Sequence, residues 1–446
     1  MTALSGIISN LRARLDTRAA LATLVLLHSA VTCLSLIRVA TFQSYIHFSG
    51  DRVWIAVAIA SVFSIVSLLF AAARFSFGYF VGFYFYTMIL GFLWIDVFSG
   101  YEYPHLNAGI SAALSIILFL VPALFITAPI RQVITLSEAN FARLLNLVLA
   151  LSVVTVAIAA TYNFRLVSIS QIYDFRSELQ FPTPLRYLIG WTSGALLPFA
   201  AACFWTRGSH GRAICTLLLL LLFYPVTLTK TAFFAPAWFA VMVLLSRYLE
   251  TRASAILSLF LPMLAGVILI SISISSLIGT HIYEIFDVAR IRVFNLINIR
   301  MIATPSSALD IYNDYFAHHP LTYFCQISLL KPLMHCPYQD QLSVLMQDTY
   351  GFGMINASLF ATEGIASVGP YFAPLTALAS GFALALGNRA AAGLPQRFVL
   401  ISCSTLPHVL LNTPLTVAML THGTALLFLL WYVMPRSIFA QPAATG

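Results

Sequence analysis

A chain of 446 residues in which 60% are hydrophobic and only 9% are charged is not an ordinary soluble domain, because such domains carry roughly a quarter charged residues. The net charge of +8 comes from basic residues scattered singly between apolar runs, so it does not indicate nucleic-acid binding. Apolar runs near the roughly 20 residues that cross a hydrocarbon core recur without the alternation of an outer-membrane barrel. The composition therefore predicts an all-α polytopic membrane protein.

Hydropathy predicts twelve membrane-spanning helices within a single membrane domain, 1–446. We expect them near residues 19–37, 53–73, 76–96, 107–129, 142–161, 187–206, 213–228, 232–246, 253–279, 358–387, 398–411 and 415–434. Two of these boundaries divide longer apolar stretches, one at Lys230 and the other at the turn signal of Asn412, Thr413 and Pro414.

Loop charge predicts the direction of the spans. With the N-terminus in the cytoplasm, the inner segments hold 13 of the 23 basic residues and only three acidic ones. Such an excess of arginine and lysine is typical of cytoplasmic loops. An even number of spans then leaves both termini inside and places two polar segments outside, a loop at 162–186 and a large loop at 280–357.

The large loop, between the ninth and tenth spans, is expected to form an outward-facing cap. Residues 281–294 have apolar side chains at helical spacing, which predicts an amphipathic helix on the outer membrane surface. A second helix should begin with Thr304 as N-cap and Pro305 at the first helical position, and should stop before Pro320.

The second helix carries a row of polar side chains. Asp310, Asp314 and His318 fall at i, i+4 and i+8 and so share one face. This face is interpreted either as the solvated side of a cap helix or as a carbohydrate-binding or acid/base face, on which Tyr312 could stack against a sugar ring.

Two of the six cysteines, Cys325 and Cys336, lie eleven residues apart in the large loop. On the oxidising side of a membrane such a pair is a candidate disulfide. The other four lie in spans, where cysteine usually acts as a small hydrophobic residue. Neither the spacing nor the neighbours of the cysteines indicate a metal site.

Charged side chains elsewhere in the outer segments are further candidates. Arg176 has the planar guanidinium that binds a phosphate or pyrophosphate through two parallel hydrogen bonds. Lys230 is expected at an outer turn between two apolar segments, and Glu363 near the outer end of the tenth span. A charge at either position is costly unless it is paired, which makes both functional candidates.

Four short segments, in their order and on their predicted side, resemble the O-antigen polymerase family (Wzy type, oligosaccharide repeat unit polymerases). Residues 300–305 followed by Tyr312 and residues 315–316 look like the Arg-x4-Pro and aromatic pattern of the large periplasmic loop in that family. The other three are residues 173–176, similar to a Tyr-x-x-Arg; 229–231, similar to a Lys-containing turn; and 356–369, similar to an Asn, acidic, Gly series. Together they cover about residues 173–381.

The chain departs from the family pattern at two places. Neither Arg176 nor Arg300 is followed by the glycine of the Arg-x10-Gly repeats that some members have. The carboxylate in the tenth span is Glu363, where Asp would be the more usual residue. These differences bear on the roles of single residues more than on the resemblance as a whole.

The resemblance implies an inverting, metal-independent glycosyl transfer in the bacterial inner membrane, without a cofactor, in a lipid-dependent (GT-C-like) glycosyltransferase architecture. Its partners would be an undecaprenyl-pyrophosphate-linked donor and acceptor, membrane lipids and a polysaccharide chain-length regulator. A cation must hold the leaving pyrophosphate and a base must accept a proton from the attacking hydroxyl. The implied pyrophosphate ligands are Arg176, Arg300 and Lys230; the base is Glu363, then His318 or His319; the sugar contacts are Tyr173, Asp310, Tyr312 and Asp314.

Two other functions remain open from the sequence. An O-antigen ligase of similar architecture would move finished glycan to a lipid A core. A flippase for the same lipid-linked sugars can also have twelve spans, but it has little use for a long external loop, and no convincing repeat relates the two halves of the chain.

Overall fold

The computed structural model describes residues 17–439 apart from 169–170, 173–174, 176–178, 273–279, 328–329 and 356–357. Over this part of the chain the secondary structure is helical, with one isolated bridge between Ile46 and Ser99. Ten helices among the described residues are long and apolar enough to cross a membrane. The predicted class, an all-α polytopic membrane protein, is confirmed.

Each of the ten spanning helices overlaps one of the first ten predicted spans, and the largest difference is at the ninth, which was expected to reach residue 279 and ends at Ser271. They are Arg18–Val39 (α2), Gly50–Ala72 (including α3 and α4), Phe77–Asp96 (α5), His105–Phe125 (α6), Glu138–Tyr162 (α7), Thr183–Thr206 (α9 and α10), His210–Thr227 (α11 and α12), Lys230–Tyr248 (α13), Thr251–Ser271 (α14) and Leu359–Ala391 (mostly α18). The boundary predicted at Lys230 is therefore confirmed.

The last two predicted spans each consist of two short helices, so ten of the twelve predicted spans are matched by helices long enough to cross a membrane among the described residues. They consist of α19 (Gln396–Ser402) with α20 (Leu406–Leu411), and α21 (Leu415–Leu420) with α22 (Thr424–Val433). Pro407 favours the start of a new helix, and Gly423 adopts a left-handed conformation at φ +76° between α21 and α22. The predicted turn at Asn412, Thr413 and Pro414 does separate α20 from α21.

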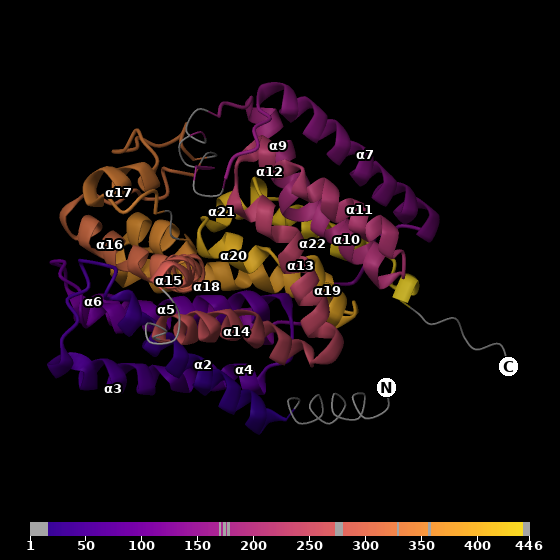
Figure 1. The fold of residues 1–446 in the computed structure, drawn as a ribbon. Helices are drawn as coiled ribbons and strands as arrows, with labels where there is room; N and C mark the ends of the chain where they lie inside the picture. The colour runs from indigo at the N-terminus through magenta and orange to yellow at the C-terminus, as the bar shows by residue number, and fades with distance from the viewer. Residues whose placement is uncertain are drawn as a thin grey trace.

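Helix α5 lies at the centre of the bundle, with α2, α6, α14 and α16 around it (Figure 1). Every residue of α5 from Phe77 to Ile95 is buried inside the protein. Its hydroxyl groups bind neighbouring helices: Tyr84 contacts Ser258 Oγ at 3.0 Å, and Tyr86 contacts Ser29 Oγ at 2.8 Å. The buried aromatic residues of α5 thus form the core against which the other helices pack.

The start of the large loop forms one uninterrupted helical run. It consists of α15 (Thr280–Phe294), a π-helical segment (Asn295–Ala303) and α16 (Thr304–His318). Both predicted helices are present, but the prediction that Thr304 is an N-cap is wrong, because Ala303 and Thr304 have helical backbone angles. Pro305 has no N–H for the carbonyl four residues earlier, and the wider π-helical turns precede it.

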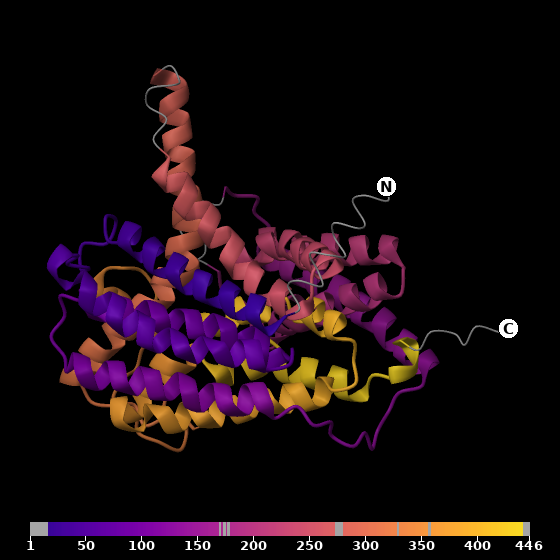
Figure 2. The same ribbon diagram turned by 90° about the horizontal axis from the view of Figure 1, so that it is seen from below.

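The two parts of this run take different positions. Figure 2 shows α15 projecting from the bundle, across the direction of the spanning helices. Helix α16 instead packs along α5, where the Ser306 hydroxyl donates to the Met88 carbonyl at 2.9 Å. The large loop therefore contributes a helix to the interior of the bundle as well as the short α17 (Leu342–Tyr350) outside it.

Candidate functional site

A small pocket of about 90 Å³ opens where α16 begins. Its lining residues are Arg300, Thr304, Pro305, Ala308, Met354, Ile355 and Asn412. Arg300 is exposed at the end of the π-helical segment, and Asn412 is exposed in the turn after α20. The pocket thus lies between the helical run of the large loop and the turn that separates α20 from α21.

The Glu363 carboxylate binds the start of α21, the helix that follows the turn with Asn412. Its Oε2 accepts from the Leu415 N–H at 3.0 Å, while Oε1 accepts from the N–H and the hydroxyl of Thr416 at 2.9 and 2.6 Å. These backbone donors belong to the first turn of α21, where helices have unsatisfied N–H groups and attract negative charge. Glu363 therefore fixes the turn that carries Asn412.

The spanning segment that contains Glu363 is itself interrupted. Gly369, within α18 (Ala366–Ala391) and shortly after a π-helical stretch (Ser358–Ile365), has φ +72° and ψ 172°, a conformation that is almost confined to glycine. The carbonyls of Ala366 and Ser367 accept instead from the N–H groups of Thr322 and Tyr323. Broken spanning helices of this kind occur where the backbone borders a binding site.

Tyr312 lies behind the pocket wall. Its side chain is fully buried and its hydroxyl donates to the Ile355 carbonyl at 3.2 Å. Since Ile355 lines the pocket, Tyr312 supports the wall from inside and has no surface for stacking on a sugar ring in this arrangement.

Asp310 is also fully buried, in a polar cluster with Asp96, Ser99, Tyr103 and His105. The Ser99 hydroxyl donates to Asp310 Oδ2 at 3.0 Å. The Tyr103 oxygen lies within hydrogen-bond distance of both Asp310 Oδ1 and Asp96 Oδ1. A hydroxyl has one proton to donate, so one of the two carboxyl groups must itself carry a proton.

The surroundings assign that proton to Asp310. His105 Nδ1 lies 2.8 Å from Asp96 Oδ1, and its Nε2 faces the Tyr101 carbonyl at 3.1 Å. An ionised Asp96 therefore has a donor of its own. Burial raises the pKa of Asp310 to about 7, and the hydrogen bonds from Tyr103 and Ser99 only partly oppose this shift.

We expect Asp310→Asn to raise thermal stability more at pH 8 than at pH 5. Because the folded pKa of about 7 exceeds the unfolded value of about 3.9, the folded protein keeps a proton between these values. That stabilisation is complete below the unfolded pKa and is lost as the pH rises through 7, whereas asparagine cannot ionise. The difference in melting temperature between variant and wild type should grow by about 3 °C or more over this range.

Differential scanning fluorimetry in detergent measures this difference. Asp348→Asn is the matched control, because Asp348 is exposed on α17. An equal shift at both pH values for Asp310→Asn would contradict the protonated state of Asp310.

The predicted polar face of α16 is not solvated along most of its length. Asp314 accepts from the Tyr350 hydroxyl at 2.6 Å and from the Glu102 N–H at 3.1 Å. The solvated interpretation is therefore wrong for Asp310, which is fully buried, whereas Asp314 is half-buried and bonded to the loop after α5 and to α17. His318 is exposed, as is His319, whose ring stacks on Tyr315.

The two histidines lie at the end of the helical run, whereas Arg300 lies near its middle. Eighteen residues separate Arg300 from His318, which corresponds to roughly 25 Å along a helix axis. The structure therefore brings Arg300, Asn412 and the turn held by Glu363 together, and it separates His318 and His319 from them.

Lys230 begins α13 immediately after a strained turn. Leu228, fully buried, has φ +49°, a left-handed conformation that is unfavourable for a branched residue. The turn leaves Lys230 partly buried at the helix start. Such strained positions concentrate at functional sites.

The remaining predicted residues are in the two loops that the loop charges place outside. Tyr173 and Arg176 lie outside the described residues. Cys325 and Cys336 are joined by a disulfide with their Cα atoms 5.3 Å apart. It closes the segment between α16 and α17.

Two parts of the site were not anticipated from the sequence. The sequence predicted Asn412 only as part of a turn, although a polar side chain between two apolar segments is also a candidate for binding. The cluster of Asp96, Tyr103 and His105 sits at the short connection between α5 and α6, where the density of titratable residues was a usable signal. No protein-family model, no curated protein and no solved structure matches this chain.

Proposed function

We propose that the protein polymerises oligosaccharide repeat units carried on undecaprenyl pyrophosphate, as a glycosyltransferase of the bacterial inner membrane that acts at the outer face. One observation carries the proposal. Arg300, in the segment that resembles the polymerase loop, lines one pocket with Asn412, and Asn412 belongs to the turn held by Glu363. The guanidinium, the amide and the carboxylate thus come from three distant segments of the chain.

In the proposed reaction a hydroxyl of the acceptor repeat unit attacks the anomeric carbon of the donor glycan. The bond from that carbon to the pyrophosphate oxygen breaks, and the configuration inverts. Arg300 stabilises the negative charge that develops on the pyrophosphate, as a planar guanidinium does well. Lys230 and Arg176 are further candidates for this role.

Glu363 is the proposed acceptor of the hydroxyl proton. A carboxylate has about four acceptor positions, and three of those on Glu363 are used by Leu415 and Thr416. One position on Oε2 is left for a substrate hydroxyl. The helix start that binds Glu363 also keeps its carboxylate oriented.

Purified protein in liposomes, supplied only with lipid-linked repeat unit, tests the proposal. We expect a ladder of glycans that differ by one repeat unit. The same repeat unit on a lipid monophosphate is the matched control, since it lacks the pyrophosphate leaving group and should give no ladder. Product only after addition of lipid A core would instead indicate a ligase, and movement across the bilayer without new bonds would indicate a flippase.

A further inference from the structure

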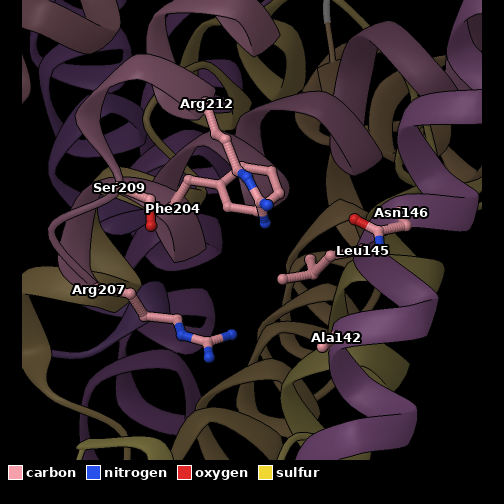
Figure 3. Close-up of a pocket in the computed structure, with 7 residues that line it drawn as sticks. All are labelled: Ala142, Leu145, Asn146, Phe204, Arg207, Ser209 and Arg212. Carbon is pink, nitrogen blue, oxygen red and sulfur yellow. The ribbon is translucent and has the colours of Figure 1, made fainter.

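A second and larger pocket, of about 190 Å³, lies between α7 and the turn that joins α10 (Leu197–Thr206) to α11 (His210–Leu221). Its lining residues are Ala142, Leu145, Asn146, Phe204, Arg207, Ser209 and Arg212 (Figure 3). We propose that this pocket binds the phosphate group of an anionic membrane lipid. The loop charges predict that this turn faces the cytoplasm, so the lipid would come from the inner leaflet.

Two arginines converge on this pocket. Figure 3 shows Arg207 and Arg212 extending into it from the α10–α11 side, with Asn146 of α7 across from them. In the part of the chain that the structure describes, no acidic side chain forms an ion pair with either guanidinium. Two cations that face one small space repel each other, and a phosphate between them would remove that repulsion and accept several charge-assisted hydrogen bonds.

Neighbouring groups hold the arginines in this arrangement. The Arg212 guanidinium lies over the Phe204 ring, with 5.9 Å between its central carbon and the ring centroid. This cation–π contact restrains a side chain that would otherwise extend toward water. The Asn146 amide adds a possible donor from the opposite wall. Arginines that extend to the membrane surface only to contact water would each point outward separately, whereas Arg207 and Arg212 line the same pocket.

The size of the pocket limits the ligand. Its volume of about 190 Å³ is below the roughly 300–1,000 Å³ of pockets that enclose drug-sized molecules. A phosphate group and the first atoms of its ester fit this space, whereas a nucleotide sugar is too large to be enclosed.

The walls favour a lipid over a free anion. Leu145 and Phe204 are buried apolar residues on the pocket surface. Leu147, which follows Asn146, is 63% exposed, and Ile214, two residues after Arg212, is 52% exposed, so α7 and α11 present apolar side chains outward near the pocket. An acyl chain can cover such side chains while its phosphate occupies the pocket, which a soluble ion cannot do.

Native mass spectrometry of delipidated protein, titrated with phosphatidylglycerol or with diacylglycerol of the same acyl chains, tests the proposal. The two lipids share the glycerol and acyl groups, and diacylglycerol lacks the phosphate. We expect the first phosphatidylglycerol to bind wild type roughly tenfold more tightly than diacylglycerol does. Arg207→Gln/Arg212→Gln should abolish this preference, and Arg207→Gln alone should reduce it.

Arg247→Gln is the matched control. Arg247 is an exposed arginine in the last turn of α13 whose guanidinium also lies against an aromatic ring, that of Tyr248 at 5.7 Å, but it does not line the pocket. Its variant should keep the wild-type preference. A double variant that still prefers phosphatidylglycerol over diacylglycerol as strongly as wild type does would overturn the proposal. Displacement of phosphatidylglycerol by an equimolar amount of inorganic phosphate would overturn the assignment to a lipid.

Discussion

Replacement of Arg300 by glutamine is expected to lower the rate of glycan polymerisation by about 100-fold or more, the usual scale for removing one group that stabilises developing charge. Glutamine keeps much of the side-chain length and its hydrogen bonding, but it carries no charge to balance a leaving pyrophosphate. Because Arg300 is exposed at the mouth of the pocket, the melting temperature should change little. The measurement is the ladder assay with purified protein at matched concentration.

Arg292→Gln is the control for this experiment. Arg292 is an exposed arginine on α15, in the same helical run, and it does not line the pocket. This variant should polymerise at the wild-type rate. Equal activity of the two variants would exclude Arg300 as the group that binds the leaving pyrophosphate.

Replacement of Glu363 by glutamine is expected to lower the polymerisation rate by more than the loss of folded protein can explain. A general base contributes about 10²- to 10⁴-fold in rate, and the amide of glutamine cannot accept the proton. The amide also places an N–H₂ group against one of the donors from Leu415 and Thr416, and each hydrogen bond to the charged group contributes about 1.5–3 kcal/mol. We therefore expect a lower melting temperature together with nearly complete loss of the ladder.

Thr416→Val separates the two effects. It removes the hydroxyl that donates to Glu363 Oε1 at 2.6 Å and keeps the carboxylate and both backbone donors. The variant should lose stability but retain most of its activity below its melting temperature. If Thr416→Val and Glu363→Gln lost activity in proportion to their loss of stability, Glu363 would be a positioning residue for α21 and not the base.

The spanning helices were predictable because their signals are local. Helix α5 was expected at 76–96 and occupies Phe77–Asp96, and the Ser76 hydroxyl accepts from the Tyr79 N–H at its start. Helix α2, expected at 19–37 and found at Arg18–Val39, agrees as closely, since twenty apolar residues in succession need no distant partner to be recognised. Helix α14 was expected at 253–279 but ends at Ser271. The two broken C-terminal segments have enough apolar residues for a span, and hydropathy alone does not reveal their internal turns.

The site was less predictable because its contacts join distant parts of the chain. The burial of Asp310 depends on Ser99 and Tyr103, more than 200 residues earlier, so its helical spacing could not distinguish a solvated face from a packed one. Thr304 and Pro305 resemble the start of a helix, but the helix that begins at α15 continues through them, so no new helix starts there. For Glu363, its place in an apolar span identified a candidate, but its partners at Leu415 and Thr416 came only from the fold.

The complete enclosure of α5 has a consequence for how the protein is made. A segment that enters the bilayer early in synthesis must first be surrounded by lipid, yet α5 meets only protein from Phe77 to Ile95 once folding is complete. Its Tyr84 hydroxyl contacts Ser258, which is translated 174 residues later. Helices α2, α3 and α6 are made close to α5 and can cover part of it, but the sides that α14 and α16 cover stay open to lipid until those helices are made.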